Sequence, residues 1–141
     1  MKRFWLCLIL CVVFTGCNVL PMTASGSPVP DTLPEDFGGK TRYGYMMDLK
    51  NTYMPSTIFS DAVKYSNSDR ENARRAVELL ISAATQAMET ANAPDQYNLY
   101  LRAYSYDLKY QDTKDETFRQ LALADYQKTV ENGGGHAQAD F

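Results

Sequence analysis

Among the residues of this chain that could do chemistry, Cys17 has the most informative position. It follows Lys2 and Arg3, an unbroken apolar run from Phe4 to Phe14, and the small residue Gly16. The run is too short for a membrane-spanning helix, which needs about 20 apolar residues, and it has the proportions of a signal-peptide core. Cys17 therefore lies where an export signal meets the exported chain. An uncleaved anchor and a plain secretory signal cut nearby are the alternatives.

The stretch Phe14-Thr15-Gly16-Cys17 resembles the lipobox of bacterial lipoproteins. Gly16 and Cys17 match that pattern, whereas Phe14 stands where Leu is usual. The resemblance implies that the Cys17 sulfur takes a diacylglycerol thioether and that residues 1–16 are removed as a signal peptide. It also implies a permanent membrane anchor, because two or three acyl chains such as palmitate bury many methylenes at about 0.8 kcal/mol each. Asn18, where an Asp would favour the inner membrane, implies the outer membrane with the protein facing the periplasm.

Removal of residues 1–16 would change what the remaining side chains can do. It takes away Cys7 and Cys11, and lipid on Cys17 would consume the last thiol, which leaves none for a disulfide, a nucleophile or a metal site. It also removes two of the 14 basic residues and none of the 17 acidic ones, so 12 minus 17 gives a side-chain balance of −5. An acidic body is a poor partner for nucleic acid, whose phosphates demand clustered Lys and Arg.

No other group of residues predicts a reaction. His136 is the only histidine and lies in a glycine-rich stretch, without an orienting partner in the sequence. Asp112, Asp115 and Glu116 lack the glycine turn and the ligand spacing of a calcium loop, so we expect them to complement a helix N-terminus. The sequence has no P-loop, no Gly-x-Ser-x-Gly elbow and no nucleophile–base pair. We therefore predict no enzyme, no cofactor and no metal.

Two segments flank the central part of the chain and differ from it in composition. Residues 17–40 are rich in proline, glycine and serine and have no helical or strand period, which predicts a flexible tether after the lipidated cysteine. A flexible chain of that length spans about 25–30 Å. Residues 133–141 begin with three glycines and predict a flexible tail.

The periodicity of apolar residues predicts three main helices between these segments. The first is expected over 69–91, where Ser68 and Glu71 have the spacing of a capping box. The second is expected over 94–110, with Pro94 as its first helical residue.

The third main helix is expected to follow a capping box of Thr113 and Glu116 and to end near Glu131. Two shorter helices are expected near 45–53 and 57–65. The predicted fold is therefore all-α, a small helical array or bundle over residues 41–132, after a disordered N-terminal tether.

The stretch from Thr41 to Ser66 is rich in tyrosine and methionine and permits two interpretations. Its side chains could form a hydrophobic face offered to a partner. They could instead seal the open end of the helical body that follows, which is the interpretation we favour.

Two of the predicted helices resemble a tetratricopeptide repeat. The matching residues are Leu99, Arg102, Ala103 and Tyr106, followed by Ala122, Asp125, Tyr126 and Thr129. The interval from Ala103 to Ala122 is longer than usual by about two helical turns, which one added turn on each helix would accommodate. Ala76, Leu80 and Ala83 have the spacing of another second helix. The resemblance implies one degenerate repeat with extended helices plus half of another, and a plain bundle without repeat ancestry is the alternative.

These observations favour a lipid-anchored helical adaptor on the periplasmic side, which supports assembly of a cell-envelope complex such as secretion, pilus or outer-membrane machinery. A structural or surface lipoprotein that contacts the cell wall is the alternative. Periodicity assigns Tyr97, Leu101, Tyr104 and Leu108 to one stripe of the second main helix. We predict that Tyr97 and Tyr104, with Tyr100 at the margin, contact the protein partner, while core packing is the competing explanation for the same tyrosines.

Overall fold

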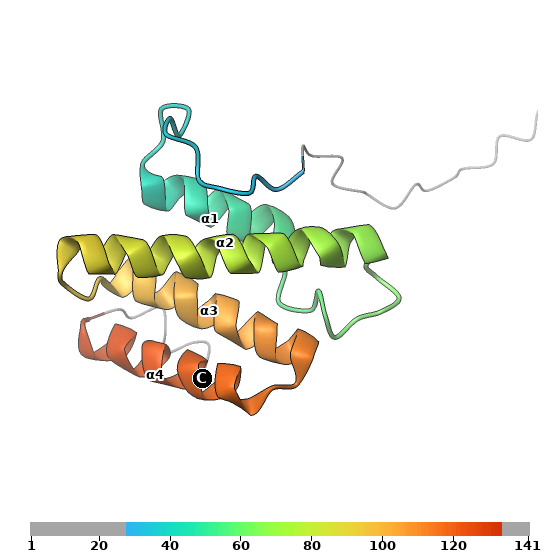
Figure 1. The fold of residues 1–141 in the computed structure, drawn as a ribbon. Helices are drawn as coiled ribbons and strands as arrows, with labels where there is room; N and C mark the ends of the chain where they lie inside the picture. The colour runs from blue at the N-terminus through green and yellow to red at the C-terminus, as the bar shows by residue number, and fades with distance from the viewer. Residues whose placement is uncertain (1–27, 134–141) are drawn as a thin grey trace, which may run out of the picture.

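A computed structural model describes residues 28–133, and this part of the chain is entirely helical in its regular structure. The order of elements is α1 (Arg42–Tyr53), α2 (Asn67–Ala91), α3 (Gln96–Thr113) and α4 (Glu116–Glu131). Successive helices run in opposite directions, and α3 lies between α2 and α4 (Figure 1). The predicted all-α array is confirmed. The predicted signal peptide, Cys17 and the segment after Gly133 lie outside the described residues.

The core has two parts, one on each side of α3. The larger part joins α1, α2 and α3 and is built around Met46, Leu80, Leu101 and Leu108, none of which is exposed. The alanines of α2 let neighbouring helices approach closely, and Ala73, Ala76 and Ala84 are completely buried. The smaller part joins α3 to α4 through a cluster of Ala103, Ala122 and Tyr126.

The tyrosine- and methionine-rich stretch seals this core, as favoured from the sequence. Met46, Leu49, Met54 and Ile58 are buried in the larger part. Several other members of the stretch pack against it while partly exposed, namely Tyr43, Tyr45, Met47, Tyr53, Phe59 and Tyr65.

The helix starts differ from the prediction, although the helices themselves are where periodicity placed them. The capping box of α2 is formed by Ser66 and Asp69, with the Asp69 N–H donating to Ser66 Oγ at 3.1 Å and the Ser66 N–H to Asp69 Oδ2 at 2.8 Å. Ser68 is already inside the helix, because the chain is extended at Ser66 and helical from Asn67. The predicted box of Ser68 and Glu71 is therefore wrong.

The caps of α3 and α4 are aspartates. Asp95 accepts from the Tyr97 N–H at 2.9 Å, so α3 starts at Gln96 rather than at Pro94. Asp115 accepts from the Thr117 N–H at 2.9 Å and starts α4. The predicted cap Thr113 instead ends α3, which is longer than predicted.

The short helix predicted over 57–65 is absent, and this segment consists of turns. Asp61 accepts hydrogen bonds from the backbone N–H groups of Val63 and Lys64. Such side-chain bonds compete with helical backbone bonds and explain the failure of the prediction.

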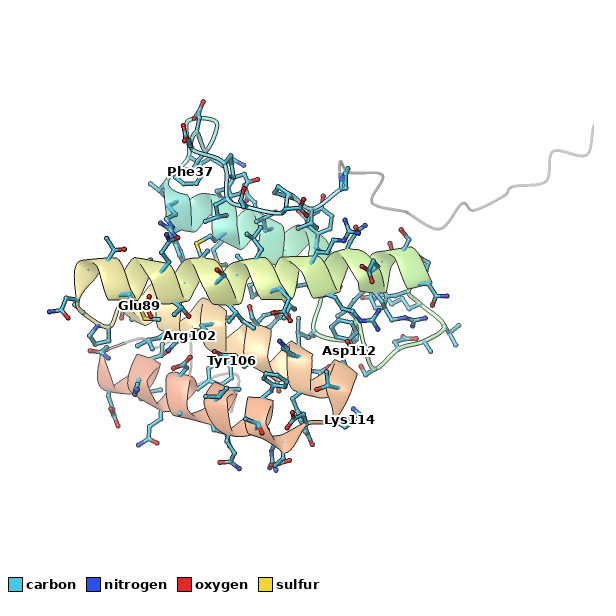
Figure 2. The ribbon with its side chains drawn as sticks, viewed as in Figure 1. Phe37, Glu89, Arg102, Tyr106, Asp112 and Lys114 are labelled. Carbon is cyan, nitrogen blue, oxygen red and sulfur yellow. The ribbon has the colours of Figure 1, made fainter. Side chains whose placement is uncertain are left out.

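The second half of the predicted tether packs against the helical body. We call residues 28–40 the strap. Val29 is only 3% exposed within the larger core, and Leu33 packs against the same core. The Phe37 ring lies 5.7 Å from that of Tyr45. Figure 2 shows Phe37 beside the start of α1. The strap runs beside α2, with residues 30–33 facing Leu79 and Ala83. The prediction of a free tether through residue 40 is therefore wrong from Val29 onward. The apolar side chains of the strap pack against the side of α1 and α2 that no other described helix covers.

Candidate partner-binding face

The three tyrosines predicted to contact a partner come together with residues of two other helices. We call this group the tyrosine face, which consists of Tyr43 and Lys50 of α1, Tyr97, Tyr100 and Tyr104 of α3, and Tyr126 of α4. The rings of Tyr43 and Tyr97 lie 4.8 Å apart, and the Tyr100 ring lies 6.3 Å from both Tyr104 and Tyr126. The rings thus form two groups, Tyr43 with Tyr97 and Tyr100 with Tyr104 and Tyr126, which together extend from α1 across α3 to α4.

The spacing of the tyrosines on α3 explains why they share a side. Residues 97, 100 and 104 are separated by three and four positions, which places them on neighbouring turns of one helix face. Tyr43 and Lys50 are seven residues apart on α1 and are aligned in the same way. From the sequence, the stretch that contains Tyr43 was one possible partner face but was not joined to the α3 tyrosines, and Lys50 was not singled out.

The tyrosines differ in exposure, and this corrects the predicted stripe. Tyr97 is 47% exposed, Tyr100 and Tyr104 are half-buried, and Tyr126 is buried. Leu101 and Leu108 are fully buried against α1 and α2, so they do not belong to an exposed stripe as predicted. The period alone could not reveal this, because it does not say that α1 covers that side of α3.

Tyr104 has a structural contact that periodicity did not predict. Its hydroxyl donates to the Met54 carbonyl oxygen at 2.7 Å and so joins α3 to the end of α1. Tyr104 therefore helps to hold α3 against the end of α1. Tyr97 is the most exposed tyrosine of the tyrosine face.

A positive charge lies within the aromatic group. Lys50 Nζ is 4.2 Å from the ring centre of Tyr104 and 5.8 Å from that of Tyr100, at distances typical of cation–π contacts. At the edge of the tyrosine face, burial raises the pKa of Tyr43, and the neighbouring Tyr97 and Asp95 raise it further. The Tyr43 hydroxyl is therefore neutral at physiological pH and can donate a hydrogen bond.

The other side of α3 is covered by ion pairs and fixes the three helices. Arg102 binds both oxygens of Asp125, Nε to Oδ2 at 2.6 Å and Nη2 to Oδ1 at 2.9 Å, and its Nη1 donates to Thr85 Oγ1 of α2. Hydrogen bonding to Asp125 raises the pKa of Arg102. Because this pair is largely shielded from water, it holds α2, α3 and α4 in one arrangement.

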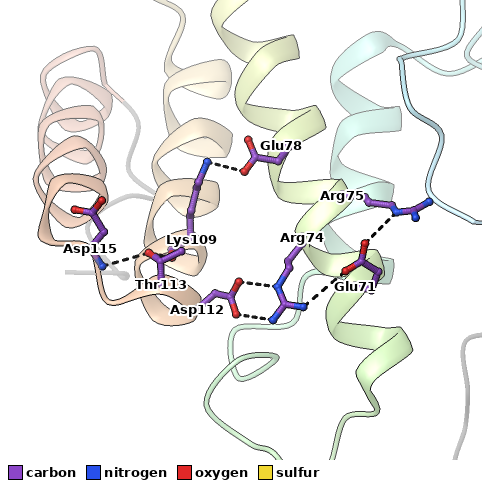
Figure 3. A network of polar contacts seen from close by, with 8 residues as sticks. All are labelled: Glu71, Arg74, Arg75, Glu78, Lys109, Asp112, Thr113 and Asp115. Carbon is purple, nitrogen blue, oxygen red and sulfur yellow. Dashed lines mark hydrogen bonds and ion pairs between the residues drawn. The ribbon is translucent and has the colours of Figure 1, made fainter.

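Two more ion pairs continue toward the other end of α3 (Figure 3). Arg74 Nε donates to Asp112 Oδ2 at 2.7 Å and Nη2 donates to Oδ1 at 2.8 Å, which lowers the pKa of Asp112. Lys109 Nζ lies 2.6 Å from Glu78. Asp112 thus pairs with α2 and does not complement a helix N-terminus, as we had expected of it.

The ion-pair side and the tyrosine face are opposite sides of α3. Tyr100 and Lys109 are nine residues apart, which is about two and a half helical turns, so their side chains point in opposite directions. One side of the array is therefore closed by internal charge pairs, while the other presents aromatic rings around one lysine.

The residues that carried the repeat resemblance also meet in space. Ala103, Ala122 and Tyr126 form the smaller core, Arg102 pairs with Asp125, and Thr129 is buried. These contacts define the α3–α4 pair and leave its ancestry open.

Residues 28–133 contain no group of histidine, cysteine, aspartate or glutamate side chains that could hold a metal ion. Within the same range no helix is long and apolar enough to cross a membrane. Comparison of the chain with protein-family models, with curated proteins and with solved structures finds no match.

Proposed function

We propose that this protein is a lipid-anchored helical adaptor, which binds an envelope protein through the tyrosine face and thereby supports assembly of a cell-envelope complex. The observation that carries the proposal is the gathering of two aromatic groups on one side of α3, Tyr43 with Tyr97 and Tyr100 with Tyr104 and Tyr126, with Lys50 beside the second group. Tyrosine is enriched where proteins bind one another, because it buries a large area at a low entropy cost and keeps a polar tip.

The ends of the array support this choice of surface. The strap covers the side of α1 and α2 that would otherwise receive another helix. At the other end, most exposed positions of α4 are polar, as in Gln120, Gln127 and Glu131, although Leu121 and Leu123 are also exposed. Terminal elements of helical arrays carry such polar outer faces, so we expect the partner on the tyrosine face rather than stacked on α4.

The anchor in this proposal is lipid on Cys17. With Val29 fixed in the core, the linker to the membrane would be residues 17–28, and its expected span falls from about 25–30 Å to about 20 Å. Cys17→Ala should leave an unprocessed precursor without lipid, because the thioether requires that sulfur. Radiolabelled palmitate incorporated equally by the wild-type and variant proteins would exclude the anchor.

Photo-crosslinking in intact cells tests the tyrosine face itself. Benzoylphenylalanine in place of Tyr97 should give one discrete crosslinked protein. Leu121 provides the matched control, because it is 40% exposed, close to the 47% of Tyr97, and lies five residues from Tyr126, about 140° around α4. The same product from both positions, or no product from position 97, would contradict the proposal.

A further inference from the structure

The tyrosine face has features that suit an occupant from the chain itself. Its middle combines aromatic rings with one ammonium group, because Lys50 Nζ lies over Tyr104 and near Tyr100. A ligand with an aromatic side chain beside a carboxylate would match both features, the ring by aromatic contact and the carboxylate by charge.

The end of α4 lies beside this face. Helices α1 and α3 begin at the same end of the array at which α4 ends (Figure 1). Val130, one residue before the end of α4, packs with Tyr100 against the cluster of Ala103, Ala122 and Tyr126. The Gly133 N–H bonds to the Val130 carbonyl at 3.0 Å, and its φ of +84° turns the chain away from the helix axis. The described part of the chain therefore ends close to the tyrosine face.

The sequence of that segment has the matching chemistry. Residues 134–141 begin with two glycines, which can lie close against a surface, and end with Asp140 and Phe141. Eight extended residues reach at most about 27 Å, whereas Tyr97 and Tyr104 are separated by about 10 Å along α3. The segment is thus long enough to cross the whole face.

We propose that residues 134–141 dock along the tyrosine face, with the Phe141 ring among the tyrosines and the Asp140 carboxylate near the Lys50 ammonium. The segment then occupies the surface offered to the partner, and the partner must displace it. The competition between this segment and a partner rests on the proposed function. The docking of the segment does not depend on that function.

Crosslinking from position 141 tests the docking in the full-length chain. Benzoylphenylalanine in place of Phe141 preserves an aromatic side chain there. Irradiation should give an internal crosslink, without a change of mass on a denaturing gel, and peptide mapping should place it within residues 42–53 and 96–113. Lys50→Glu should lower the yield about threefold or more, and adding Asp140→Lys should restore it.

Two controls complete this experiment: a variant at a second lysine, and a chain that carries no lipid. Lys64 also lies over a tyrosine ring, that of Tyr65, but in the loop before α2, so Lys64→Glu should leave the yield unchanged. The internal crosslink should persist with Cys17→Ala, which separates its outcome from that of the anchor and the partner. Crosslinks to a second copy, sites spread over α2 and the outer side of α4, or a yield indifferent to Lys50→Glu would overturn the inference.

Discussion

Tyr97 and Tyr104 lie seven residues apart on α3, yet their surroundings give them different roles. The Tyr104 hydroxyl donates to the carbonyl of Met54, a residue that is 1% exposed. Tyr97 packs beside Tyr43 and is nearly half exposed. Removal of a hydroxyl should therefore have different consequences at the two positions.

Tyr104→Phe should lower the free energy of unfolding by about 1–2 kcal/mol, because it leaves the buried Met54 carbonyl without this donor. Tyr97→Phe is the matched control and should change it by less than about 0.5 kcal/mol. Urea denaturation followed by circular dichroism measures both. Equal losses in the two variants would contradict the distinction drawn between them.

Asp112 provides a test by pH. Its hydrogen bonds from Arg74 lower its pKa in the folded protein, so the contribution of the pair to stability is present above the unfolded pKa of about 3.9 and is lost as the pH falls below it. Asp112→Asn should destabilise the protein near neutral pH by about 1 kcal/mol at most, because Arg74 is half exposed.

This penalty should shrink as the pH is lowered to about 2, because the wild-type carboxyl takes up a proton over that range as well. Arg74→Met should show the same dependence on pH. A penalty of constant size in denaturation experiments at both pH values would mean that Asp112 stabilises the fold by a route other than this ion pair.

At the scale of the elements, the start of α2 depends on the cap Ser66 and not on Ser68. Ser66→Ala should cost about 1 kcal/mol, because it removes the side-chain oxygen that accepts from the Asp69 N–H. Ser68→Ala, inside the first turn, should be neutral or slightly stabilising, since alanine is the better helix former. Thermal melts of the two variants distinguish the observed cap from the one predicted from sequence, which requires the opposite order.

These caps illustrate what the sequence could and could not provide. The three main helices follow from apolar residues at three- and four-residue steps, and α2, α3 and α4 are where that period placed them. Their starts do not follow, because Ser66, Ser68, Asp95 and Thr113 are all acceptable caps and the path of the arriving chain chooses among them. Likewise, Tyr97, Tyr100 and Tyr104 could be grouped from their spacing, but the burial of Leu101 and Leu108 depends on where α1 packs.

The strap extends the folded body beyond the four helices. Val29→Ala should lower the free energy of unfolding by up to about 2 kcal/mol, since Val29 is 3% exposed in the larger core. Val63→Ala is the matched control, because Val63 is 99% exposed, and should change stability by less than about 0.5 kcal/mol. Chemical denaturation measures both, and a neutral Val29→Ala would mean that the strap is not part of the cooperative unit.

At the scale of the whole molecule, one side of the array stabilises the fold through ion pairs, and we assign partner binding to the other side. Ion pairs from Arg74, Lys109 and Arg102 lock α2, α3 and α4 together on one side. The tyrosine face on the other side joins α1, α3 and α4 through aromatic rings. In the proposed function, the body is held near the membrane through Cys17 and binds its partner on that second side.

Quantitative co-purification from solubilised membranes tests this account most directly. The wild-type protein should bring down one envelope protein in a stoichiometric amount. Tyr97→Ala should reduce its recovery about tenfold, as expected for an interface tyrosine, with little loss of stability, and the matched Leu121→Ala should retain it. Undiminished recovery with Tyr97→Ala, or an equal loss with Leu121→Ala, would contradict the claim that the tyrosine face binds the partner.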